Sequence, residues 1–233
     1  MSDMVRSMPV PGDYAGVIVS KPWGYEYLMY QNARVALWYL RIHAGKQTSL
    51  HCHPRKKTGL VLLCGEARVS YLNDSVRLKA LSRVMIRPGL FHSTMALSAE
   101  GIVMLEIESP PQKDDLVRLD DVYGRKEQSY EGVEAISPAT EECISLELPE
   151  KGQSVKYDLY ACTLSIEFVQ DLAETRHRKT DDVIIVLEGG LFNKGNDEIL
   201  GPGDVVTPST LVRLSDSFAA RDGIYLLTIR KAS

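Results

Sequence analysis

Three of the five histidines of this chain lie in two short segments, Gly45-Lys-Gln-Thr-Ser-Leu-His51-Cys-His53 and Arg87-Pro-Gly-Leu-Phe-His92. His51 and His53 are two residues apart, so on a β-strand both imidazoles point to the same face. His92 follows a Pro-Gly turn, which places it at the start of a strand packing beside the first. Neutral imidazole is the commonest protein ligand for borderline divalent metals. The grouping predicts a three-histidine metal site inside a small β-barrel.

The rest of the chain is typical of an all-β protein. Short apolar or alternating runs are separated by turns rich in Gly, Pro, Asn and Asp, and helical periodicity is nearly absent. The clearest runs are residues 33–42, 59–63, 67–72, 83–86 and 102–107. Short strands at such even spacing favour a barrel or a sandwich.

Composition excludes several classes of function. The chain has 233 residues, 44% of them hydrophobic, and a net charge of −4, which gives no support for binding nucleic acid or an anionic membrane. No apolar run approaches the length of a membrane span, and the first 14 residues lack the apolar core of a signal peptide. The four cysteines have no CxxC spacing, and Cys52 is expected in the core. We therefore expect a cytoplasmic protein with reduced thiols, and with neither a nucleic-acid nor a membrane partner.

After residue 141 the pattern of the first half starts again. Thr58-Gly-Leu-Val-Leu-Leu-Cys-Gly65 is echoed by Asp182-Val-Ile-Ile-Val-Leu-Glu-Gly189, which indicates an internal duplication. The polar stretch between the copies is typical of a linker. We predict an N-terminal extension over residues 1–20, a first barrel over 21–125, a linker over 126–141 and a degenerate second barrel over 142–233.

The second copy lacks most of the metal ligands. Thr175 and Arg213 stand where the first copy has His51 and His92, and only His177 remains. A lone histidine is more often a hydrogen-bonded structural residue than a ligand. The second half is expected to be a packing partner or a dimerisation unit, so a homodimer is one possible assembly.

The two histidine segments resemble the motifs of the cupin superfamily. Gly45, His51, His53 and Gly65 match its first motif, and Gly89 and His92 match its second. The flanking segments Lys21-Pro-Trp-Gly-Tyr-Glu26 and Asp114-Asp-Leu-Val-Arg-Leu-Asp-Asp-Val-Tyr-Gly-Arg125 resemble the cupin domain of type II mannose-6-phosphate isomerases. The resemblance covers about residues 20–125 and implies two tandem double-stranded β-helix (jelly-roll) barrels.

The resemblance also implies a divalent metal ion, and the chain departs from the family at one ligand. Thr58 stands where the motif has a glutamate, and Ala96 where it has an asparagine. Three neutral histidines with an open position suit zinc best. Manganese, iron, nickel and cobalt stay open, because nitrogen ligands alone do not select among them.

Two carboxylates are candidates for proton transfer. Glu106 and Glu108 alternate with Val103, Leu105 and Ile107, so they share one face of a strand. If that face lines the barrel, they are natural general acid and base groups, one of them with a raised pKa from burial beside its twin. The alternative is a solvated face on an edge strand.

Arg118 and Arg125 are candidates for binding an anionic substrate, since a guanidinium binds phosphate or carboxylate in a bidentate manner. Lys56 follows the histidine pair on a loop expected at the barrel mouth. Trp23, with Lys21 and Tyr25, is expected to pack over that opening, either stacking on a sugar or acting as a structural plug.

The leading hypothesis is therefore an enzyme that acts on a sugar or sugar phosphate. The family resemblance implies aldose–ketose isomerisation, with His51, His53 and His92 holding the metal and Glu106 or Glu108 moving the proton. One alternative is a non-catalytic carbohydrate-binding or regulatory bicupin, which Thr58 and the degenerate second copy favour. Another is a three-histidine iron dioxygenase.

Overall fold

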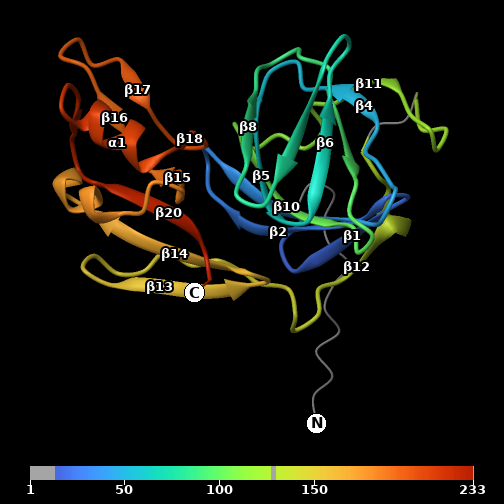
Figure 1. The fold of residues 1–233 in the computed structure, drawn as a ribbon, viewed down its shortest axis with the longest axis horizontal. Coiled ribbons are helices and arrows are strands. Elements are labelled where there is room, and N and C mark those ends of the chain that lie inside the picture. The colour runs from blue at the N-terminus through green and yellow to red at the C-terminus, as the bar shows by residue number, and fades with distance from the viewer. Residues whose placement is uncertain (1–13, 127–129, 233) are drawn as a thin grey trace.

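The computed structural model describes residues 14–126 and 130–232, so residues 1–13 of the predicted extension lie outside it. The chain forms two β-barrels side by side, the first from blue to green and the second from yellow to red (Figure 1). The predicted all-β class with two tandem barrels is confirmed.

The first barrel is built on a seven-stranded antiparallel sheet with the order β12-β1-β2-β3-β10-β5-β8. Its strands are β1 (Val17–Lys21), β2 (Gly24–Gln31), β3 (Ala36–Ile42), β5 (Lys57–Cys64), β8 (Arg83–Ile86), β10 (Ile102–Ser109) and β12 (Ile136–Pro138). Two smaller sheets close it, with the orders β7-β6-β9 and β11-β4. Their strands are β4 (Leu50–Cys52), β6 (Glu66–Ser70), β7 (Ser75–Lys79), β9 (Ser93–Ala96) and β11 (Val117–Asp120).

The second barrel repeats this topology. Its sheets have the orders β13-β14-β20-β15-β18 and β17-β16-β19, which match β2-β3-β10-β5-β8 and β7-β6-β9 of the first barrel. The strands are β13 (Ser154–Leu159), β14 (Cys162–Val169), β15 (Val183–Glu188), β16 (Leu191–Phe192), β17 (Glu198–Leu200), β18 (Val205–Val206), β19 (Ala219–Ala220) and β20 (Ile224–Lys231). The internal duplication found in the sequence is therefore present in the strand order.

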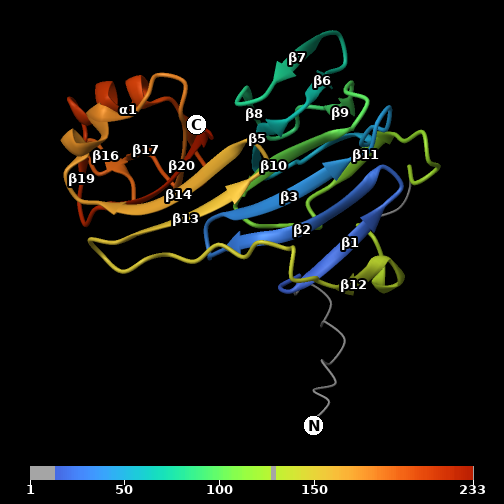
Figure 2. The ribbon, with the colours of Figure 1, turned by 60° about the horizontal axis from the view of Figure 1, so that its bottom comes forward.

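The central strands are apolar on both faces, and the two faces belong to different cores. On β10, Ile102 and Met104 point into the first barrel, whereas Val103, Leu105 and Ile107 point out of it. The outward residues belong to one large cluster that also contains buried side chains of β14, β15 and β20. The large sheets of the two barrels thus share one apolar layer of side chains. Figure 2 shows the strands of the two sheets next to each other.

Helices replace the site-forming segments in the second barrel. The 3₁₀-helix η2 (Leu172–His177) lies where the first barrel has β4, and α1 (Pro208–Ser215) lies near the counterpart of His92. Thr207 caps α1 by accepting a hydrogen bond from the Thr210 backbone N–H, and Pro208 follows as its first residue. The nearly helix-free sequence pattern gave no sign of this eight-residue helix.

The stretch between the barrels is structured in its described part. The 3₁₀-helix η1 (Val133–Ala135) leads into β12, and β12 pairs with β1 of the first barrel. The strand β1 itself begins at Val17, inside the stretch predicted as an extension. The four domain boundaries therefore stay predictions, and the residues on either side of 21–125 contribute strands to the first sheet.

Candidate metal centre

The backbone brings His51 and His92 together directly. Each donates its N–H to the carbonyl of the other, at 3.0 Å from His51 and 2.8 Å from His92. Such a hydrogen-bonded antiparallel pair places both side chains on the same face, and His53 follows on that face two residues later. One potential ligand atom of each histidine lies within 4.8 Å of the others. The predicted convergence of the three imidazoles is confirmed.

The three imidazoles present the same nitrogen to the shared space. Nδ1 of His51 donates to the Ser49 carbonyl at 2.8 Å, Nδ1 of His53 to the Asp115 carbonyl at 2.7 Å, and Nδ1 of His92 to the Leu90 carbonyl at 3.1 Å. With the proton on Nδ1, each Nε2 keeps its lone pair. Nε2 of His53 is buried and has no hydrogen-bond partner. This donor set fits a divalent metal ion.

The histidines are in the protonation state that a metal requires. Burial lowers the pKa of His53 to about 3 and that of His92 to about 4, and it lowers the pKa of His51 well below its ordinary value. The neighbouring imidazoles and Lys56 act in the same direction. All three rings are therefore neutral at pH 7, and no proton has to leave before a metal binds.

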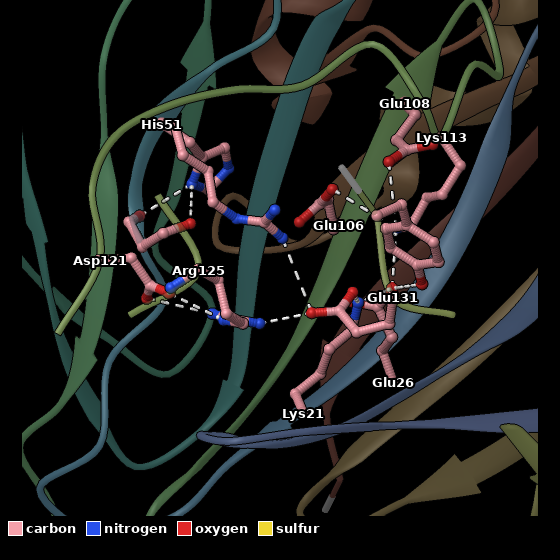
Figure 3. A network of polar contacts seen from close by, with 12 residues as sticks. Lys21, Glu26, His51, Glu106, Glu108, Lys113, Asp121, Arg125 and Glu131 are labelled. Carbon is pink, nitrogen blue, oxygen red and sulfur yellow. Dashed lines mark hydrogen bonds and ion pairs between the residues drawn. The ribbon is translucent and has the colours of Figure 1, made fainter. Parts of the chain in front are cut away.

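Glu106 and Glu108 both face the interior of the first barrel. Their strand β10 lies between β3 and β5 at the centre of the sheet, so the solvated edge strand is excluded. Glu108 is fixed by cations: Lys56 Nζ lies 2.7 Å and Lys113 Nζ 3.2 Å from its Oε1. Lys113 also approaches Glu26 at 3.1 Å, and it lies only 4.0 Å from Glu106 (Figure 3).

These contacts shift the pKa values of the two carboxyls in opposite directions. Burial raises the pKa of Glu106 to about 7, and the negative Glu108 beside it acts in the same direction. Burial alone would raise the pKa of Glu108 too, but Lys113 and Lys56 outweigh it and lower that pKa. The expected carboxyl with a raised pKa is therefore Glu106. Near pH 7 Glu106 can accept or release a proton, whereas Glu108 stays ionised.

The two predicted arginines reach the same cavity from the far side. Arg118 is the cross-strand partner of His51 in the pair β4–β11, and Arg125 is held by Asp121 at 2.8 Å. Both guanidinium groups approach the carboxylate of Glu131, Arg118 at 3.6 Å and Arg125 in a short hydrogen bond. Figure 3 shows Glu131 reaching Arg125 from the side opposite Asp121.

Two other predicted positions, Lys56 and Tyr25, differ from expectation, whereas Trp23 lies at the cavity. Lys56 is not at an open mouth: its side chain is buried, pairs with Glu108 and donates to the Gln112 carbonyl at 3.0 Å. Trp23 is buried in the interior core and lines the cavity. Tyr25 points to the other face of the sheet, where its ring stacks on Tyr39. The irregular backbone at Gly24, with φ +152°, separates Trp23 from Tyr25.

Several functional side chains escaped the sequence reasoning. Glu26 belongs to the first flanking segment that resembles the isomerases, and Lys113 directly precedes the second, so these parts of the chain contained a usable signal. Asp115 supports the site twice, because its carbonyl fixes His53 and its carboxylate accepts the N–H groups of Arg55 and Lys56. Glu131 lies in the stretch predicted as a linker, and nothing in its sequence neighbourhood pointed to the cavity.

The second barrel has no comparable centre among its described side chains. The side chain of His177 lies outside the described part. Thr175 donates to the Leu172 carbonyl at 2.6 Å within η2, and the interior is filled by apolar residues such as Ile184, Leu211 and Leu226. Among the side chains that the structure describes, His51, His53 and His92 form the one histidine, cysteine or carboxylate cluster of metal-binding geometry.

Comparisons with known proteins found similar solved structures only. No protein-family model and no curated protein matches the sequence. Among solved structures, KdgF from Halomonas sp. is 15% identical, with 43% of this chain and 85% of that chain aligned and a TM-score of 0.37. A double-stranded β-helix protein from Klebsiella pneumoniae is 17% identical over 48% and 90% of the two chains, with a TM-score of 0.39. An RmlC-like cupin from Shewanella frigidimarina is 17% identical over 42% and 80%, with a TM-score of 0.36.

Each of these alignments covers less than half of this chain, about the length of one barrel. The first barrel combines its strand order with three converging histidines, and the second barrel repeats the strand order. No helix among the described residues is long and apolar enough to cross a membrane.

Proposed function

We propose that the first barrel is a metal-dependent enzyme site for a sugar or sugar phosphate, and that it catalyses aldose–ketose isomerisation as in mannose-6-phosphate isomerases. One observation carries the proposal. The orphaned Nε2 of His53, the proton-exchanging Glu106 and the guanidinium of Arg118 all border one cavity of about 60 Å³. A metal ligand, a proton carrier and an anion-binding group are what this reaction needs in one place.

His51, His53 and His92 would hold the metal, with zinc as the first choice. Bound there, the metal would act as a Lewis acid that polarises the substrate carbonyl. In isomerisation a proton moves between two adjacent carbon atoms of the sugar. Glu106 in its ionised form would take the proton from one carbon and return it to the other, which a carboxyl with a pKa of about 7 does efficiently at neutral pH.

Two lysines beside Glu108 make Glu106, rather than Glu108, the carboxyl that transfers the proton. Lys56 and Lys113 hold Glu108 ionised, so Glu108 has little tendency to carry a proton at pH 7. Its charge in turn disfavours ionisation of Glu106. Glu108 is thus proposed as a positioning residue, whereas the sequence alone left the two carboxylates equivalent.

The metal site is tested by elemental analysis of the full chain purified without chelators. We expect one equivalent of a divalent metal in the wild-type protein and none in His53→Ala. Cys52→Ala is the matched control, because Cys52 is the adjacent residue on the opposite strand face and should leave the stoichiometry unchanged. Equal metal content in His53→Ala and the wild-type protein would remove the site.

The activity is tested with the metal-loaded protein on a panel of hexose and pentose phosphates. Glu106→Gln should lower kcat about 10²–10⁴-fold with its metal content unchanged, because general acid–base catalysis contributes about this much. A protein that binds a sugar phosphate tightly without turnover would instead be the non-catalytic bicupin. Oxygen consumption with bound iron would indicate the dioxygenase.

A further inference from the structure

Glu131 occupies a cationic pocket within the site described above. Its carboxylate is bound by Lys21 and Arg125 in short contacts, and Arg118 lies 3.6 Å away. All four side chains are at most 10% exposed. Figure 3 shows the Glu131 carboxylate between Arg125 and Lys21. An anion of this chain is therefore already bound where three cations converge.

We propose that Lys21, Arg118 and Arg125 form an oxyanion subsite for a phosphate group, and that Glu131 is an internal occupant which this phosphate displaces. The inference rests on the proposed function for the sugar that bears the phosphate. It adds the location of the phosphate and a residue that competes with it.

The charges around the cavity favour an anionic ligand. Five cationic side chains border the cavity, namely Lys21, Lys56, Lys113, Arg118 and Arg125. Against them stand Glu26, Glu106, Glu108 and Glu131, with Asp121 behind Arg125. When Glu131 withdraws, the cations outnumber the remaining carboxylates, and an anionic ligand supplies the compensation that buried charges need.

The cavity is too small for a sugar phosphate unless a side chain moves out of it. The cavity measures about 60 Å³, which is room for about four or five water molecules, whereas ligand sites usually measure about 300–1,000 Å³. Glu131 lies in a loop before η1 and outside any strand, so its side chain can rotate away while β4 and β11 stay paired. Its departure frees volume at the three cations that the ligand then contacts.

The test measures binding of inorganic phosphate to the full-length protein by isothermal titration calorimetry, with EDTA present. Glu131→Gln keeps the shape and removes the charge. Glu134→Gln is the matched control, because Glu134 is three residues away, exposed on η1, and removes the same net charge. If Glu131 fills the subsite nine-tenths of the time or more, Glu131→Gln should bind phosphate about tenfold tighter or more. Glu134→Gln should bind it as the wild-type protein does.

Two results would overturn the inference: an affinity of Glu131→Gln within about twofold of the wild-type value, or an equal gain in Glu134→Gln. Should Glu131→Gln fail to fold, Glu131→Asp answers the question, because it keeps the charge but reaches less far. A gain in phosphate affinity with Glu131→Asp supports displacement, and no gain refutes it.

A second set of titrations distinguishes binding of the phosphate group from binding of the sugar. Mannose 6-phosphate should gain affinity in Glu131→Gln, whereas mannose should not. Because neither set of titrations depends on turnover or on the metal, this inference can fail while the isomerase activity stands. It can equally survive when no sugar phosphate is converted.

Discussion

Replacement of Glu106 by glutamine tests the buried carboxylate pair without any substrate. Burial raises the pKa of Glu106 from 4.5 to about 7 in the folded protein. A group with a raised folded-state pKa contributes stability that is fully present below its unfolded value, near pH 4.5, and is lost as pH rises through about 7. At 1.36 kcal/mol for each pH unit between the two values, the loss is on the order of 3 kcal/mol. The glutamine side chain of the Glu106→Gln variant cannot ionise, so this variant should not show this loss of stability.

The measurement is urea unfolding of the metal-free protein at a series of pH values from 4 to 9. The wild-type protein should lose on the order of 3 kcal/mol of unfolding free energy relative to Glu106→Gln over this range, mostly between pH 5 and 8. Glu108→Gln is the control on the same strand face. Since the pKa of Glu108 is lowered, this variant should instead be less stable than the wild-type protein at neutral pH. Parallel curves for the wild-type protein and Glu106→Gln would refute the raised pKa.

Three further substitutions test the packing and the ion pairs by unfolding at pH 7. Lys113→Met should cost about 3–5 kcal/mol, because it leaves Glu26 and Glu108 buried without the cation they share, and a cost under 1 kcal/mol would contradict this network. Leu105→Ala should lower the unfolding free energy by about 2–5 kcal/mol, because Leu105 is fully buried in the layer between the barrels. The variant should still unfold in a single transition, and two separated unfolding transitions would show that the barrels are independent. Thr58→Val should raise stability by about 1 kcal/mol, because the buried Thr58 hydroxyl has no hydrogen-bond partner, and a loss of stability would reveal one.

Much of the fold could be predicted because alternation and turn residues are local signals. The runs 59–63, 83–86 and 102–107 lie within β5, β8 and β10, and the echo around Asp182 anticipated the repeated strand order. The helix α1 escaped because it is short, and its cap at Thr207 and Pro208 reads equally well as a turn. The pairing of β12 with β1 joins segments more than 100 residues apart, and no local pattern specifies such a contact.

The candidate site, too, was predictable only where local sequence signals determine it. His51 and His53 were predictable because strand geometry fixes residues two apart, and the Pro-Gly turn placed His92. The difference between Glu106 and Glu108 could not be predicted, because it arises from Lys56 and Lys113, which lie outside β10 and contact Glu108 more closely. Lys56 was misplaced for a related reason: a lysine after a histidine pair looks solvent-exposed until a buried carboxylate is known to face it.

The apolar layer shared by the barrels makes the first barrel dependent on the second for the burial of its outer sheet face. Cut at the linker, a fragment with residues 21–125 would expose Val61 of β5 and Leu105 and Ile107 of β10 to water. Such a fragment should self-associate rather than behave as a minimal enzyme. Contact with the first barrel thus constrains the outer faces of β14, β15 and β20, whereas their inner faces pack within the second barrel.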